Sequence, residues 1–208
     1  TASSYMGIGI VYDELGEYDK ALEYHDKALE IKKDILGENN PDTAMSYGNL
    51  GVVYDNLGDY DKALEYYNKS LEIRKDVLGE NHPDTADSYN NIGVVYDKLK
   101  DYNKALEYYN KALEIRKAVL GENHPNNAVS YNNIGNVYLN LGNYDKALEF
   151  KNKALEIRKD VLGEKYPDTA DSYNNTGLIY FNLGEYDKAL EYYIKALEIT
   201  KEVLGENH

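Results

Sequence analysis

Apolar residues recur along the chain at steps of three and four positions, which is the spacing of one face of an α-helix. Within residues 41–82, a first run follows Ala44, Tyr47, Leu50, Tyr54 and Leu57. A second run covers residues 63–78, where charged residues fill the positions between the apolar ones. Gly58 lies between the two runs, and glycine readily leaves the helical conformation. The pattern therefore predicts two amphipathic helices joined by a tight turn.

This helical hairpin is repeated along the whole chain. A proline opens four of the copies at a spacing of 42 residues, and the copies occupy residues 1–40, 41–82, 83–124, 125–166 and 167–208. Self-similarity at such a period is typical of solenoids, in which each repeat packs only on its neighbours. We therefore expect an all-α fold of five helix-turn-helix hairpins that form one right-handed superhelical domain over residues 1–208.

The ends of the predicted helices are marked by glycine and proline. Pro83 stands where a new helix begins, since proline is tolerated at the first helical position. Gly79 precedes it in the sequence VLGEN, and we expect this glycine to close the preceding helix in the left-handed conformation.

The order Tyr47-x2-Leu50-Gly51-x2-Tyr54, followed by Gly58, Tyr60, Ala63 and Tyr67, resembles the tetratricopeptide repeat. Tyrosine takes the positions where that family usually has tryptophan and phenylalanine. The second helix continues through Leu78, past Lys75, where the family's usual proline would fall. This longer form, with its LG-x-x-HP connector, resembles the 42-residue repeats of kinesin light chain. The resemblance implies a scaffold that binds peptides or proteins.

The amino-acid composition indicates few reactive or membrane-associated features. The 23 tyrosines fall at fixed repeat positions, which indicates a packing role between stacked helices. The chain has no cysteine, so it has neither a disulfide framework nor a thiolate nucleophile. The first residues do not form a signal peptide, and no apolar run is long enough to span a bilayer. A cytoplasmic location is the default expectation.

The net charge is −14, which argues against nucleic acid and anionic membranes as partners. This charge is unevenly distributed. The successive copies carry −5, −4, −1, +1 and −5, so the two ends are acidic and the middle is nearly neutral.

Catalytic and metal sites are not indicated. His82 and His124 occupy the same connector position one repeat apart, and stacked helices are roughly 8–10 Å apart, too far for two imidazoles to share one zinc ion. His208 is the third member of this set, and His25 stands alone. Since no phosphate loop or nucleophilic triad is present either, we expect no catalytic residues, no cofactor and no metal.

The first helix of each repeat lines the inner face of the superhelix in the family that this chain resembles. A stripe of varied or polar positions on these helices is the candidate peptide-binding surface: Asn49, Asp55, Asp87, Asn90, Asn91, Val94, Asp97, Asn132, Asn133, Asn136, Asn174, Asn175 and Leu178. A ladder of asparagines suits an extended peptide, because a carboxamide both donates to and accepts from main-chain groups. The alternative is that these amides bond to neighbouring helices or to water.

The charge on this stripe indicates which partners fit. Relatives that take carboxylates or acidic peptides use Lys and Arg on this face. This chain instead carries aspartates there, with Lys98 the main exception: Asp13, Asp55, Asp87, Asp97 and Asp171. The family's acidic ligands therefore do not carry over. We expect a basic or neutral partner, bound in an extended conformation.

A second hypothesis is a structural, engineered or recently duplicated array with no dedicated ligand, because the copies are nearly identical. The two ends resemble interior surfaces: Tyr5, Met6 and Ile10 stand where a preceding repeat would pack, and Ile194 replaces the asparagine of the other copies. We therefore expect weak head-to-tail self-association.

Overall fold

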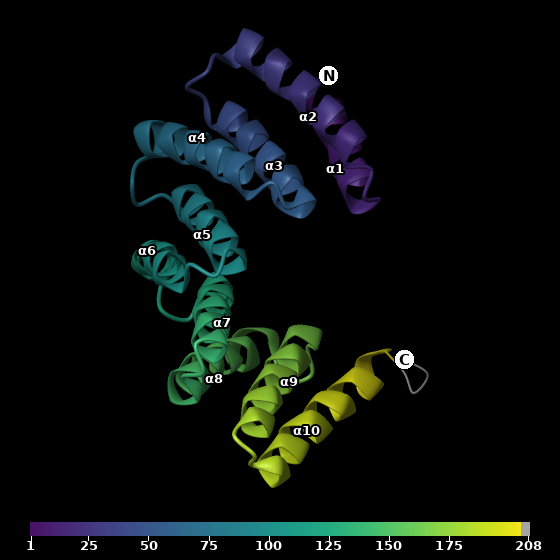
Figure 1. Ribbon diagram of the computed structural model, residues 1–208, viewed down its shortest axis with the longest axis vertical. Helices are drawn as coiled ribbons and strands as arrows, with labels where there is room; N and C mark the ends of the chain where they lie inside the picture. Colours follow the sequence, from purple (N-terminus) through teal and green to yellow (C-terminus); the bar gives the residue numbers. More distant parts are fainter. Residues whose placement is uncertain (205–208) are drawn as a thin grey trace. The chain divides into compact units, whose positions relative to one another are not determined.

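The computed structural model describes residues 1–204, which form ten α-helices and no strand (Figure 1). In chain order these are α1 (Ala2–Glu14), α2 (Tyr18–Leu36), α3 (Pro41–Leu57), α4 (Tyr60–Leu78), α5 (Pro83–Lys98), α6 (Tyr102–Leu120), α7 (Pro125–Asn140), α8 (Tyr144–Leu162), α9 (Pro167–Asn182) and α10 (Tyr186–Leu204). Each odd-numbered helix pairs with the helix that follows it. The predicted fold of five helical hairpins is confirmed. His208 lies outside the described residues.

Contacts divide the chain into two compact units, one ending at Ile115 and the other beginning at Arg116. In the first unit α2 packs on α3 and α4 packs on α5, and in the second α8 packs on α9. In each of these junctions the second helix of one repeat contacts the first helix of the next. The single domain expected for residues 1–208 stays a prediction.

The core of each unit is built at these junctions. In the first unit, Tyr67 and Leu71 of α4 form one buried cluster with Tyr89 and Ile92 of α5. The corresponding cluster in the second unit contains Leu155 of α8 together with residues of α9 and α10. Each repeat therefore buries its apolar face against its neighbour, as expected for a solenoid.

Helix starts follow the prediction closely. Pro41, Pro83, Pro125 and Pro167 are the first residues of their helices. Pro83 and Pro125 are preceded by histidines that act as N-caps, since His82 Nδ1 accepts a hydrogen bond from the Asp84 amide at 3.1 Å and His124 Nδ1 accepts one from the Asn126 amide at 3.2 Å. These two rings therefore have a structural role at the helix N-terminus.

The ends of the helices agree with the prediction from the sequence only in part. Gly58 takes the left-handed helical conformation, with φ of 78° and ψ of 9°. Gly79 was expected to do the same, and this expectation is wrong: its φ is 96° but its ψ is 161°, an extended conformation that also requires glycine. The extended geometry leads the chain away from α4 into the connector. None of the described helices is long and apolar enough to cross a membrane.

Candidate functional site

The thirteen stripe residues lie on α3, α5, α7 and α9, and none of them is buried. Asp87, Asn174 and Leu178 are exposed, and the other ten are partly exposed. We call this surface the helix A stripe. Because the chain divides into two compact units, we describe the part on α3 and α5, with its contact to α1, first and the part on α7 and α9 second.

In the first unit, carboxylates on the first helices of two repeats, Asp13 and the stripe residue Asp55, bond to the first helix of the next repeat. Asn56 Nδ2 donates to both carboxylate oxygens of Asp13, at 3.1 and 3.2 Å. One repeat further on, Lys98 Nζ lies 2.8 Å from Asp55 Oδ1, and the Asp55 side chain keeps only 10% of its surface exposed. Part of the negative charge that the sequence assigns to a ligand is therefore neutralised within the chain.

In the second unit, the stripe surrounds a buried lysine that sequence reasoning missed. Lys151 of α8 is 1% exposed, and its Nζ donates to Asn132 Oδ1 at 2.7 Å and to Asn136 Oδ1 at 2.5 Å. Asn175 Nδ2 approaches the same Asn132 oxygen at 3.5 Å. Burial and the nearby Arg158 guanidinium lower the pKa of the Lys151 ammonium to about 7.

Lys151 occupies a position that is aromatic in the other repeats. The equivalent residues are His25, Tyr67, Tyr109 and Tyr193, and each packs over a glycine of the paired helix. A Cβ at Gly93 would lie only 2.7 Å from the Tyr109 ring, so the two helices approach closely because glycine stands there. The sequence did contain a signal for Lys151, because it is the one lysine at a repeat position that carries histidine or tyrosine in the other four copies.

At three positions, hydrogen bonds within the chain support the alternative that the asparagines bond to neighbouring helices. Asn132, Asn136 and Asn175 bond within the chain, so these three amides hold the repeats and Lys151 in place. Apolar side chains are also exposed on the first helices of the repeats: Met45 and Val52 in the first unit, and Val129, Leu178 and Phe181 in the second. The stripe is thus a mixed surface, with apolar contact points between amides and carboxylates.

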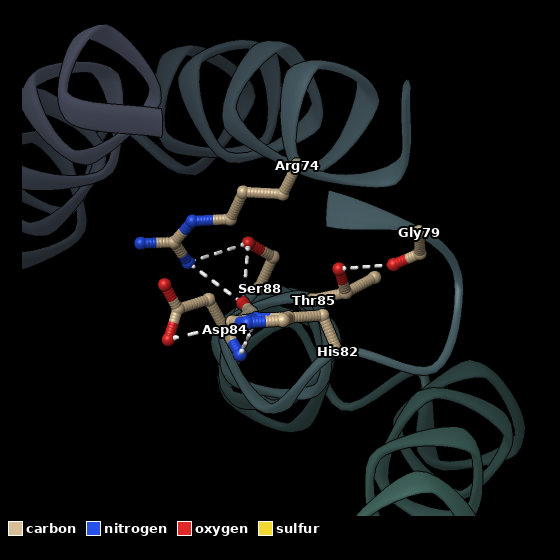
Figure 2. Close-up of polar contacts among 6 residues, drawn as sticks. All are labelled: Arg74, Gly79, His82, Asp84, Thr85 and Ser88. Atoms are coloured by element: carbon tan, nitrogen blue, oxygen red, sulfur yellow. Dashed lines mark hydrogen bonds and ion pairs between the residues drawn. The ribbon is translucent and has the colours of Figure 1, made fainter. Parts of the chain in front are cut away.

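A second set of polar contacts joins consecutive repeats, and we call it the connector clasp. Figure 2 shows Arg74 of α4 reaching over the first turn of α5, where its Nη1 donates to the Asp84 carbonyl oxygen and to Ser88 Oγ, each at 2.8 Å. Thr85 Oγ1 donates to the Gly79 carbonyl oxygen at 2.9 Å, which ties the connector to the same turn. The clasp satisfies polar groups at a junction that is otherwise apolar.

The clasp recurs in the second unit. Arg158 Nη1 donates to the Asp168 carbonyl oxygen at 3.1 Å and to Ser172 Oγ at 2.6 Å. In the first repeat Lys32 replaces arginine and donates to the Asp42 carbonyl oxygen at 2.9 Å. The clasp was not predicted from the sequence, where nothing distinguishes Arg74 from the other charged residues of a helix surface.

Two further observations concern the titratable groups of the described residues. Burial lowers the pKa of His25, whose ring packs on Gly9. Among residues 1–204, no three His, Cys, Asp or Glu side chains are grouped so that they can hold a metal ion.

Comparison with known proteins adds a family match. Residues 1–76, 56–118, 98–160 and 127–202 match a family model described as the tetratricopeptide repeat. A comparison with curated protein sequences gives no match.

Several solved structures have a similar fold. BtubC (BKLC) from P. vanneervenii is 28% identical with a TM-score of 0.82, over 96% of this chain and 79% of that one. A putative kinesin light chain from P. anserina with nearly identical TPR-like repeats is 19% identical with a TM-score of 0.79, over 99% and 97% of the two chains. MamA from Desulfovibrio magneticus RS-1 is 22% identical with a TM-score of 0.64, over 97% and 96%. The last two show a shared fold alone.

Proposed function

Because the chain belongs to the tetratricopeptide repeat family, whose fold generally mediates protein–protein interaction, we propose that its helix A stripe binds an extended segment of a protein partner. The family is typically non-catalytic. The stripe is the surface of the paired helices that combines exposed side chains with varied residue types from one repeat to the next.

The observation that carries this proposal is the set of apolar side chains left exposed on first helices. Leu178 and Phe181 of α9 are 41% and 53% exposed, and Val52 of α3 is 36% exposed. In the same helices, Val53 and Ile179 are fully buried. Apolar contact points flanked by amides suit a peptide whose side chains enter alternately, while its main chain bonds to carboxamides.

Charge on the stripe favours a basic or neutral segment. Asp87 and Asp171 are exposed, and no arginine stands on the stripe of the described helices. The pairing of Asp55 with Lys98 reduces this preference at one point in the first unit. A basic peptide should therefore bind more weakly as salt is raised, because screening shortens the reach of exposed carboxylates.

The test is a titration of basic, neutral and acidic peptide libraries against the 208-residue chain at low and high ionic strength. Leu178→Asp and Asn174→Ala should reduce binding of the selected peptides, because both residues are exposed on the stripe. Asn110→Ala is the matched control, since Asn110 is an exposed asparagine on the second helix of its repeat. Equal loss in the control, or selection of acidic peptides, contradicts the proposal.

A further inference from the structure

We propose that Lys151 holds the carboxamides of Asn132 and Asn136 with their nitrogens toward the helix A stripe, so that this pair donates hydrogen bonds to a main-chain carbonyl oxygen of the bound segment. The inference deepens the proposed function and rests on it, because it names the chemical group that the stripe takes in the fourth repeat. The two amides contact the ligand, and Lys151 is a positioning residue beneath them.

The fourth repeat departs from the others at two positions that contact each other. Lys151 takes a position that is histidine or tyrosine in the other copies, and Asn136 takes one that is apolar in them. The residues equivalent to Asn136 are Ile10, Val52, Val94 and Leu178. Because Lys151 Nζ donates to Asn136 Oδ1 at 2.5 Å, the exceptional cation and the exceptional amide form one bonded pair. Two departures in direct contact indicate a shared role.

The ammonium of Lys151 fixes the direction in which both amides point. A lysine ammonium only donates hydrogen bonds, so it bonds to the oxygen of a carboxamide and never to its nitrogen. Asn132 Oδ1 and Asn136 Oδ1 both accept from Lys151 Nζ, and the Nδ2 group of each side chain therefore points away from the ammonium. Since both asparagines are partly exposed on the stripe, their nitrogens are the atoms that a ligand meets there.

This orientation selects an acceptor on the ligand. An unrestrained asparagine presents either its donor or its acceptor, because rotation of the amide exchanges the two. The pair over Lys151 presents donors only, one turn apart on α7. Each amide oxygen also bonds to a cation, which polarises the amide and strengthens its N–H groups as donors. The matching group on an extended segment is a carbonyl oxygen, which every peptide main chain supplies.

The buried lysine lowers the stability of the fold, which favours a functional role over a packing role. Lys151 is 1% exposed, and burial together with the Arg158 guanidinium lowers the pKa of its ammonium to about 7. The groups of α7 and α9 that bond at this centre are the uncharged amides of Asn132, Asn136 and Asn175. Among the described residues no carboxylate offsets the burial of this charge. Such local conflicts with stability are expected at functional sites.

Asn136→Asp separates the two roles of this amide. Aspartate has the same shape and keeps an oxygen toward Lys151, so the variant should unfold at the same temperature as the original chain or higher. Its outward atom changes from a donor to an acceptor, and binding should therefore weaken about tenfold or more. If Asn136 only held Lys151 in place, the variant would bind as tightly as the original chain.

The probe is the tightest-binding peptide from the neutral and basic libraries, measured by calorimetry at pH 6, where Lys151 is protonated. Asn110→Asp is the matched control, because Asn110 is exposed on α6 and the substitution changes the charge equally, away from the stripe. It should change affinity by less than about twofold. For a basic peptide, the added negative charge of Asn136→Asp would by itself tighten binding, so the expected loss has the opposite sign to a simple charge effect.

Lys151→Met tests the positioning role directly. Methionine is flexible and of similar length but lacks the ammonium, so the two amides are free to rotate and binding at pH 6 should weaken about threefold to tenfold. The original chain should lose affinity by a similar factor between pH 6 and pH 9, because the ligand favours the protonated lysine. Lys151→Met should show no such change with pH, provided that the side chains of the chosen peptide do not titrate in this range.

Thioamide replacement of each main-chain carbonyl of the peptide identifies the acceptor, because sulfur is a weak acceptor. One replacement should weaken binding to the original chain about tenfold and have little effect on binding to Asn136→Asp. If no position behaves in this way, the acceptor is not a main-chain carbonyl and the proposal is overturned. Equal affinity of Asn136→Asp and the original chain also overturns it and leaves the proposed function standing, whereas failure of every library peptide to bind overturns both.

Discussion

Replacing Lys151 by tyrosine should stabilise the protein. The pKa of the buried ammonium falls from 10.5 to about 7, and at about 1.4 kcal/mol for each pKa unit its burial costs about 5 kcal/mol at neutral or lower pH. Two hydrogen bonds to Asn132 and Asn136 are lost in the variant, each worth about 1 kcal/mol. Since Tyr109 fills the equivalent site over Gly93, tyrosine fits the position, and the expected gain is about 3 kcal/mol.

The pH dependence follows from the direction of this pKa change. Below pH 7 the lysine is protonated in both the folded and the unfolded chain, so the full cost is present. Between pH 7 and 10.5 the unfolded chain binds more protons than the folded chain, and the stability of the original protein therefore rises with pH. The advantage of Lys151→Tyr should be largest at pH 6 and shrink by about 3 kcal/mol at pH 9.

The assay is urea unfolding at pH 6, 7, 8 and 9, followed by far-ultraviolet circular dichroism. Lys201→Gln is the control, because Lys201 is an exposed lysine of α10 and its replacement should change stability by less than about 0.5 kcal/mol at every pH. A Lys151→Tyr variant whose stability gain is the same at pH 6 and pH 9 refutes the reasoning, because the cost of burying the charged lysine must fall as the lysine loses its proton.

Substitutions at two further sites, Gly93 and Arg74, test the contacts between helices. Gly93→Ala should destabilise the protein by about 1–3 kcal/mol, since the Tyr109 ring leaves no room for a methyl group, whereas Gly7→Ala, with open space around it, should stabilise by about 0.5–1 kcal/mol in the same thermal unfolding experiment. Arg74→Met should cost about 2–4 kcal/mol, because Ser88 and the carbonyl oxygen of the next helix lose their donor. An Arg74→Met variant as stable as the original chain shows that the clasp is dispensable.

The sequence was sufficient for the fold because the determinants of the fold are local and repeated. Three of these determinants each act within a few residues of the chain: proline at the first helical position, Gly58 between the helices, and apolar residues at helical spacing. The long second helix, which runs through Leu78 and so passes Lys75, where the family usually has proline, was also predicted correctly. Gly79 shows the limit of local reasoning: the sequence predicts a positive φ, but the direction of the connector sets ψ.

The polar contacts were not predictable in the same way. Arg74 bonds to residues 10 and 14 positions further along, and that distance is bridged only after the connector has folded back. For the stripe, the sequence located exposed positions but left open whether Asn132 and Asn136 face a ligand or the chain. The answer depends on Lys151, 19 and 15 residues away on the paired helix.

The connector clasp also bears on how such a chain changes length. Each clasp joins one second helix to the first turn of the next helix, and its arginine recurs in the second, third and fourth copies as Arg74, Arg116 and Arg158. Excision or duplication of one whole period among these three copies in the gene therefore recreates an intact junction. The number of repeats can consequently change between related genes without new stabilising substitutions. The residues of the helix A stripe can change independently of these junctions.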